Sequence, residues 1–239
     1  MPPQMKKPVV VIACKVLQDV LEQLLPGDLA PVRTFLDYGL HDVPDDLRST
    51  VQSAVDRIEE PSLVMLGYGL CGNGLQGIRS GDHTLVIPRT DDCIALLLGS
   101  YQAYLQEFRS VPGTYYLTKG WLESGSDPLK EYHEYESQYG AEKAMWVMDM
   151  QYQNYERLSL VARSQDELEE YRPKTREVAA FCERWGMRYE ELLGSDEYVS
   201  RLVKATVALS NEDDAPDWLD TEFVVVPPGG EIRQEMFMR

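Results

Sequence analysis

The chain has 239 residues, of which 40 are acidic and 23 basic, so its formal net charge is −17. Hydrophobic residues make up 44% of it, which excludes a disordered chain, and a chain of this length buries roughly 70% of its unfolded surface. Nucleic acid and anionic membrane surfaces are excluded as partners, because affinity for both comes from basic side chains. Four cysteines are too few for a disulfide scaffold.

No targeting or membrane-spanning segment is visible in the sequence. The first apolar run extends only from Val9 to Ala13, whereas a signal peptide needs about 7–15 apolar residues. No run approaches the roughly 20 apolar residues of a membrane span. We therefore expect a cytoplasmic protein, in a compartment that keeps thiols reduced.

Short apolar runs alternate with amphipathic stretches along the whole chain. Unbroken runs rich in β-branched residues are typical of buried strands, and apolar residues three or four apart are typical of helices. In chain order these patterns predict a strand at 8–13, a helix at 16–25, a strand at 31–38, a helix at 44–60, strands at 62–68 and 84–88, a helix at 91–108 and a strand at 114–118. They further predict a helical stretch at 128–157 broken near Gly140, a strand at 158–163, a helix at 165–185, a helical stretch at 190–209 interrupted near Gly194, and a strand at 222–226.

This alternation is typical of an α/β fold in which a mostly parallel sheet has helices on both faces, a Rossmann-like three-layer sandwich. We expect a single α/β domain over residues 1–239. A weak change of composition near residues 123–128 leaves a second arrangement open, with two similar sub-lobes over residues 1–122 and 123–239.

Four side chains of metal-ligand type follow successive predicted strands: Cys14, His41, Cys71 and Cys93. Ligands of open α/β sheets bind beyond the carboxyl ends of the strands, so these side chains converge on one rim if their strands are neighbours. Three thiols and an imidazole suit zinc, and thiolates also suit an iron–sulfur cluster. The sequence predicts one metal centre on these four residues, with zinc favoured and an iron–sulfur cluster as the alternative.

A free cysteine is in general more often a small buried side chain than a ligand. Cys182 fits that interpretation, because it lies within the helical pattern at 165–185, and we predict it in the core. The other three cysteines lack the close CxxC pairs of a zinc finger, so the fold has to assemble their site. Buried thiols without a metal are the remaining interpretation.

A glycine-rich loop follows Cys71. Gly72, Gly74 and Gly77 match the dinucleotide-binding fingerprint GxGxxG. Only six residues separate Gly77 from the next predicted strand, whereas a nucleotide-binding crossover needs on the order of a dozen. We favour a tight loop whose amides at Gly72, Asn73 and Gly74 bind an anion or a substrate oxygen.

Three further residues are candidates for catalysis. Asp91 and Asp92 precede Cys93 and are placed to act as a general base or to position a ligand. The alternative role, given equal weight, is N-capping of the following helix. Lys119 follows the fifth predicted strand, where it is placed to bind an anionic substrate.

Together these motifs resemble a family known as domain of unknown function 1638, over roughly residues 8–160. The family's pattern has an Ala-Cys pair, a Leu-His-Asn element, a Tyr-Gly-x-Cys-Gly-x-Gly loop, a later cysteine and Pro-Gly-Thr-x-Tyr-Leu-Thr. The matching positions here are Ala13-Cys14, Leu40-His41, residues 68–74, Cys93 and residues 112–118. The chain departs from the pattern in having Asp42 after the histidine and Asp92 before the later cysteine.

The resemblance implies a companion of corrinoid-dependent methyl-transfer systems in anaerobes, and hence one-carbon chemistry. We predict a metal-dependent enzyme, of transferase or lyase type, or an accessory factor that acts on a small molecule, with a corrinoid protein or methyltransferase as partner. The alternative is a non-catalytic metal or cofactor carrier that serves a corrinoid methyltransferase. A closed four-ligand site favours the carrier, and three ligands with an exchangeable group favour the enzyme. The tyrosine-rich stretch at 128–157 permits a homo-oligomer.

Overall fold

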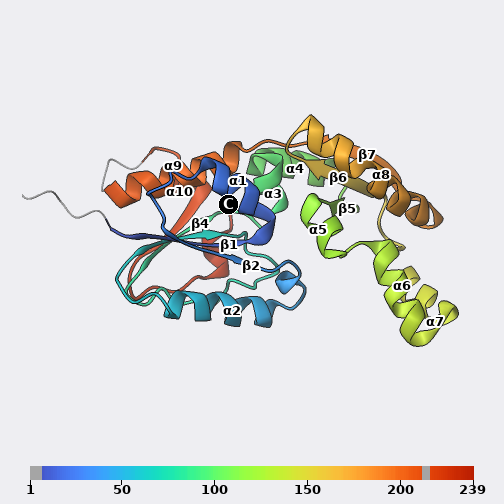
Figure 1. Cartoon of the computed structure of the whole chain (residues 1–239), viewed down its shortest axis with the longest axis horizontal. Helices are drawn as coiled ribbons and strands as arrows, with labels where there is room; N and C mark the ends of the chain where they lie inside the picture. The colour runs from blue at the N-terminus through green and yellow to red at the C-terminus, as the bar shows by residue number, and fades with distance from the viewer. Residues whose placement is uncertain (1–6, 212–215) are drawn as a thin grey trace, which may run out of the picture. The chain divides into compact units, whose positions relative to one another are not determined.

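The computed structural model describes residues 7–211 and 216–239. The chain forms two compact units, one made of Met1–Leu96 with Asp196–Arg239 and the other of Leu97–Ser195. Helices and mostly parallel strands build both units (Figure 1), so the predicted α/β fold class is confirmed. Among the described residues, no helix has the combination of length and apolarity needed to cross a membrane.

A five-stranded sheet in the order β2-β1-β3-β4-β8 forms the centre of the first unit. Its strands are β1 (Val9–Cys14), β2 (Val32–Leu36), β3 (Leu63–Gly67), β4 (Thr84–Pro88) and β8 (Phe223–Val226). The first four strands are parallel, and β8 pairs antiparallel to β4. The carboxyl ends of β2, β1, β3 and β4 therefore meet at one edge of the sheet.

Helices cover both faces of this sheet. They are α1 (Gln18–Leu24), α2 (Pro44–Asp56), α9 (Glu197–Asn211) and the short α10 (Leu219–Glu222). The α2 helix lies on one face, and α1 and α9 lie on the other (Figure 1). The apolar residues of α2, at Leu47, Val51 and Val55, share a buried core with alternate residues of β1, β3 and β4. This core extends to the carboxyl edge of the strands.

The second unit has its own parallel sheet, in the order β5-β6-β7. The strands are β5 (Thr114–Leu117), β6 (Arg157–Ala162) and β7 (Arg188–Leu193). The helices are α4 (Tyr101–Ser110), α5 (Lys119–Ser124), α6 (Pro128–Tyr139), α7 (Ala141–Tyr152) and α8 (Gln165–Cys182), and α3 (Ile94–Leu98) spans the boundary between the units. Single 3₁₀ turns complete the regular structure at Lys15–Leu17, Leu40–Asp42, Glu183–Trp185 and Gln234–Met236.

The helical stretch predicted over residues 190–209 is wrong at its beginning, because Arg188–Leu193 is the strand β7. The interruption predicted near Gly194 is confirmed, since α9 begins at Glu197. Two carboxylates on this strand are held by arginines: Glu190 binds Arg157 at 2.8 Å, and Glu191 binds Arg172 at 2.8 Å. These long-range ion pairs and the pairing with β6 override the local helix propensity of a Glu-Glu-Leu-Leu run.

The helix predicted over residues 91–108 is divided in two. Gly99 has a φ of 89°, in the left-handed region that ends helices. The Ser100 hydroxyl then accepts a hydrogen bond from the Ala103 amide at 3.0 Å, which caps the next helix. The break expected near Gly140 is confirmed, since α6 ends at Tyr139 and α7 begins at Ala141.

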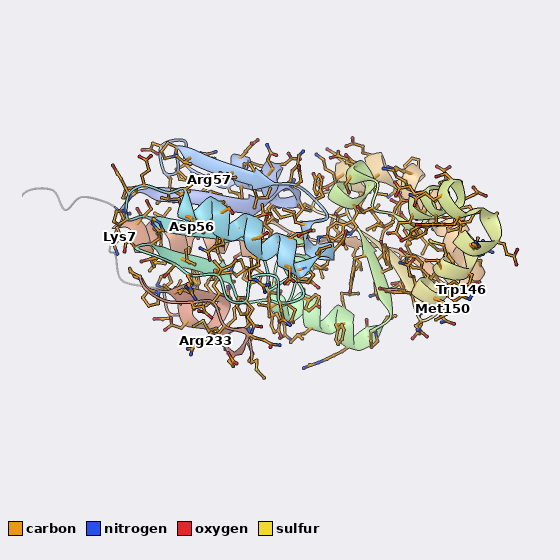
Figure 2. All side chains as sticks on the ribbon, turned by 90° about the horizontal axis from the view of Figure 1, so that it is seen from below. Lys7, Asp56, Arg57, Trp146, Met150 and Arg233 are labelled. Carbon is orange, nitrogen blue, oxygen red and sulfur yellow. The ribbon has the colours of Figure 1, made fainter. Side chains whose placement is uncertain are left out.

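Three residues of the second unit show the contrast between its core and its surface. Cys182, the last residue of α8, is fully buried in the apolar core of this unit, which confirms the prediction that it is a core residue. Trp146 and Met150 lie one turn apart on α7 with exposed fractions of 66% and 58%, and Figure 2 shows both at the outer surface of this helix.

Candidate functional site

The register of β1 and β3 places a thiol beside a phenol at the carboxyl edge of the first sheet. Ala13 pairs with Gly67, so the next residues along the two strands, Cys14 and Tyr68, are neighbours. Both belong to the core on the α2 face of the sheet, as strand alternation requires. On the other side of β1, Cys14 pairs with Leu36 at the end of β2.

Two loops meet at this edge and carry the next two cysteines. The Leu70 amide donates to the Thr90 carbonyl at 2.9 Å, and the Cys71 amide donates to the Asp91 carbonyl at 2.7 Å. The loop after β3 is thus bound to the loop after β4 as if the two strands continued. These hydrogen bonds bring Cys71 into the neighbourhood of Cys93.

Gly69 is required for this close approach of the two loops. An ideal Cβ atom at Gly69 would lie 2.7 Å from the Cα of Asp92 and 2.8 Å from its backbone nitrogen. Because both obstacles are backbone atoms, no side-chain rotation relieves the clash. Glycine is therefore the residue that allows the hydrogen bonds of Leu70 and Cys71 to form.

Replacing Gly69 with alanine is expected to separate the two loops and to lower the free energy of unfolding by about 1–3 kcal/mol, as overpacking does in general. Denaturant titration of the variant measures the loss. Gly27 is a matched control, since an added Cβ there meets no atom within 4 Å. Equal stability of the Gly69→Ala variant and the wild type would contradict the close approach described above.

The backbone around Cys71 is strained. Cys71, Gly72 and Asn73 have consecutive φ values of 48°, 61° and 69°, all in the left-handed region. This conformation costs a residue with a Cβ atom roughly 1–2 kcal/mol, and asparagine tolerates it better than most. The carbonyl of Cys71 accepts a hydrogen bond from the Gly74 amide at 3.0 Å, which closes the turn. Strain of this kind is concentrated at functional sites.

The three thiols of the first unit influence one another electrostatically. Burial raises the pKa of the Cys71 thiol far above its usual range, and Asp92 and Cys14 raise it further. Burial likewise raises the pKa of Cys93, to which Cys71, Cys14 and Asp92 add. For Cys14 burial also raises the pKa, opposed by a hydrogen bond to the backbone of Val16. All three thiols are therefore held in their neutral form.

Two buried hydroxyl groups at the same edge have no hydrogen-bond partner among the described residues: Tyr68 Oη and Thr90 Oγ1. Burial raises the pKa of the Tyr68 phenol far above its usual range, and the charges of Cys14, Cys71 and Cys93 raise it further. Sequence reasoning missed Tyr68, because a tyrosine after an apolar strand is typical of a core residue. The sequence does contain one signal: Tyr68 is two residues from Leu66 and four from Val64, which places all three on the same face of the strand.

His41 lies in the loop after β2, on the Leu40–Asp42 turn. Its Nε2 is 3.3 Å from Oδ1 of Asp42, the residue that departs from the family's pattern. Leu40 packs against the same core as Cys14 and Tyr68. The loop thus borders the thiols, while the described polar contact of the imidazole is with the adjacent residue, Asp42.

The predicted catalytic residues occupy different places. Asp92 Oδ1 accepts a hydrogen bond from the Ile94 amide at 2.9 Å, which is the N-capping role, and its charge also reaches Cys71 and Cys93. Asp91 is exposed beside it. Lys119 belongs to the second unit, where it begins α5 and lies 4.0 Å from Glu123.

Within residues 7–211 and 216–239, no three side chains of Cys, His, Asp or Glu form a group that could hold a metal ion. The structure thus brings Cys14, Cys71 and Cys93 within electrostatic reach of one another without arranging them at ligand spacing. The chemistry of these donors nevertheless fits a soft metal ion, because thiols bind zinc and iron strongly once deprotonated.

The fold and this site define a class: an α/β protein with a buried cluster of thiols at the strand ends of a parallel sheet. The chain belongs to the family described as protein of unknown function (DUF1638), whose pattern matches residues 35–203. His41, Cys71 and Cys93 lie within the matched residues, and Cys14 precedes them. No curated protein matches the chain, and no solved structure matches it.

Proposed function

We propose that the chain binds one metal ion through Cys14, His41, Cys71 and Cys93, or through three of these four so that one position stays open for substrate, and acts on a small molecule as a metal-dependent enzyme or accessory factor. The observation that supports this is the convergence of three cysteines, from three separate strand ends, around one buried edge of the sheet. Cysteines that serve only as small apolar side chains are not expected to be concentrated at the edge of the sheet where α/β proteins bind ligands.

The electrostatics of the site also favour a cation. A bound cation displaces the thiol protons, and its charge then offsets the repulsion among the three resulting thiolates and the Asp92 carboxylate. Zinc is the preferred metal for thiolate and imidazole donors, and an iron–sulfur cluster is the alternative. Binding requires the thiol side chains to turn toward a common point. A metal in this position would supply Lewis acidity, and the exposed carboxylate of Asp91 is placed to accept a proton from a substrate.

The setting of this activity follows from the resemblance described above. We propose a role in one-carbon metabolism beside a corrinoid-dependent methyltransferase, in the cytoplasm, where thiols stay reduced. The amides of Gly72, Asn73 and Gly74 remain our candidates for holding a substrate oxygen, and Lys119 remains a candidate for substrate binding.

Metal content tests the proposal directly. Protein purified without oxygen is expected to contain about one equivalent of zinc or iron by elemental analysis. Protein stripped of metal is expected to bind one equivalent of cobalt(II), with the absorption of a thiolate complex. A protein that is colourless with cobalt(II) and contains less than stoichiometric zinc, iron, nickel or cobalt as purified would refute the metal site.

The number of protein ligands separates the enzyme from the carrier. X-ray absorption of the zinc-loaded protein counts sulfur and lighter donors around the metal. Three sulfur atoms and one imidazole describe a closed site and favour the carrier, whereas three protein ligands with one exchangeable oxygen favour the enzyme. The His41→Ala variant provides the comparison, because it changes the spectrum only if the imidazole is a ligand.

A further inference from the structure

The hydroxyl of Tyr68 is an unexplained buried polar group beside the thiol cluster. The residue is 3% exposed, and its Oη has no hydrogen-bond partner among the described residues. A buried hydroxyl left without a partner destabilises a folded protein, and phenylalanine fills the same space without that cost. The presence of tyrosine here therefore points to a partner that the described residues do not supply.

The position of the phenol indicates where that partner binds. Tyr68 is the strand neighbour of Cys14 by the register of β1 and β3, and it is three residues from Cys71 along a loop that is hydrogen-bonded to the loop of Cys93. Cys14, Tyr68 and Cys71 share one core on the α2 face of the sheet. The Tyr68 side chain thus lies beside the proposed ligands, and its hydroxyl forms no hydrogen bond with any of them.

We propose that the Tyr68 hydroxyl donates a hydrogen bond to the ligand bound at the thiol cluster, and that this ligand is a small molecule or ion that presents an acceptor atom beside the metal. This inference rests on the proposed metal site. A phenol keeps its proton at neutral pH and so acts as a donor, and its partner must offer a lone pair. Carboxylate, alkoxide and azide are of this class.

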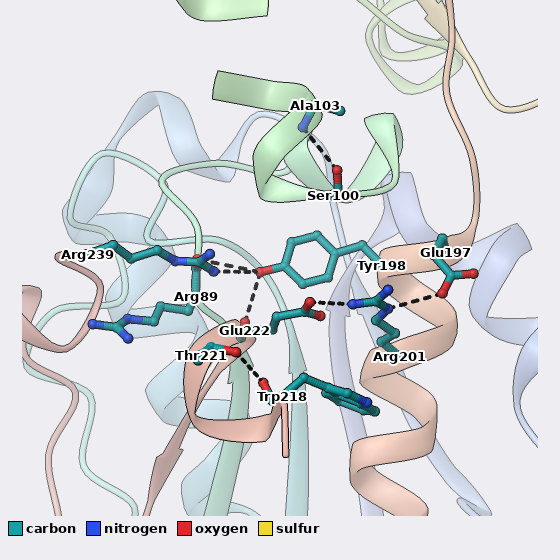
Figure 3. A network of polar contacts seen from close by, with 10 residues as sticks. All are labelled: Arg89, Ser100, Ala103, Glu197, Tyr198, Arg201, Trp218, Thr221, Glu222 and Arg239. Atoms are coloured by element: carbon teal, nitrogen blue, oxygen red, sulfur yellow. Dashed lines mark hydrogen bonds and ion pairs between the residues drawn. The ribbon is translucent and has the colours of Figure 1, made fainter. Parts of the chain in front are cut away.

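Tyr198 provides a matched control within the same unit. It is 2% exposed, as deeply buried as Tyr68, but its hydroxyl donates to the Glu222 carbonyl at 2.9 Å and also receives a contact from the guanidinium of Arg239 at 3.4 Å (Figure 3). Loss of the hydroxyl should therefore harm the fold at Tyr198, whereas at Tyr68 it should harm only ligand binding.

The test uses the full chain loaded with cobalt(II) and titrated with azide, which is a small acceptor anion. The Tyr68→Phe variant is expected to bind cobalt(II) at the same stoichiometry and to bind azide about tenfold more weakly, the equivalent of one hydrogen bond. Its Tm without metal should equal or exceed that of the wild type. The Tyr198→Phe variant should bind azide as the wild type does, with a Tm lower by about 2–4 °C.

The outcomes are distinguishable. A wild type that binds no cobalt(II) overturns the proposed metal site and this inference with it. If the wild type binds cobalt(II) but azide binds equally well to Tyr68→Phe, or to neither protein, only the role of Tyr68 is overturned. A Tm of Tyr68→Phe reduced as much as that of Tyr198→Phe also counts against it, since the hydroxyl would then have a structural partner.

Discussion

Replacing Cys71 with alanine is expected to abolish stoichiometric cobalt(II) binding. Cys71 interacts electrostatically with the other groups of the site. Beyond the effect of burial, Asp92 and Cys14 raise its pKa, and Cys71 in turn raises the pKa of Cys93. Removing one of three thiolates leaves too few soft donors to compete with water and buffer for the metal. Titration of the metal-free variant, followed by the thiolate absorption of cobalt(II), measures the loss.

Cys182 is the control for this experiment. It is also buried, and burial followed by the charge of Asp127 raises its pKa to about 12, but it lies in the core of the second unit. The Cys182→Ala variant should lose some stability and keep one equivalent of cobalt(II). Equal loss of metal binding in the two variants, or full binding in both, would rule out a site built on Cys71.

High pH is expected to destabilise the metal-free protein strongly. The thiols of Cys71 and Cys93 have pKa values in the folded protein far above the ordinary 9.0, so they keep their protons where the unfolded chain loses them. Their contribution to stability is complete below pH 9 and is lost as the pH rises toward the folded pKa values. Between pH 8 and pH 10 we expect about 1.4 kcal/mol per thiol, or roughly 3 kcal/mol for the pair.

Denaturant unfolding at a series of pH values measures this effect. Other groups also titrate in the range, so the informative quantity is the difference between the wild type and a Cys71→Ser/Cys93→Ser variant. The variant should show a shallower decline, by about one proton on average in the slope of free energy against pH between pH 8 and pH 10. Parallel declines in the two proteins would show that these thiols ionise as easily in the folded protein as in the unfolded chain.

Local patterns predicted most strands of the fold, because unbroken runs of β-branched residues, such as residues 8–13, are found mainly in buried strands. The partners of the strands were not predictable in the same way. The strand at 114–118 follows four strands of one sheet in the sequence, yet β5 pairs with β6 in a separate sheet. The strand β7 was mistaken for a helix, because its two glutamates are stabilised by arginines distant in sequence.

For the site, the rule that strand ends converge predicted which cysteines to consider together. The structure adds three features that no spacing could supply. The Tyr68 hydroxyl lies on the face of Cys14 through strand register, Gly69 allows the two loops to touch, and Cys71 has a left-handed backbone. Each of these depends on contacts between segments that are separated along the chain.

The antiparallel strand β8 has a consequence for how the protein is made. The first four strands of the five-stranded sheet leave the ribosome early, but their last partner, Phe223–Val226, is translated only after the whole of Leu97–Ser195. The Ser195 amide donates to the Leu97 carbonyl at 3.2 Å, so the inserted segment begins and ends at the same place. During synthesis this inserted unit is therefore the first whose sequence is complete. The sheet that carries the thiols stays incomplete until β8 is made, and the edge of β4 is unpaired during that time.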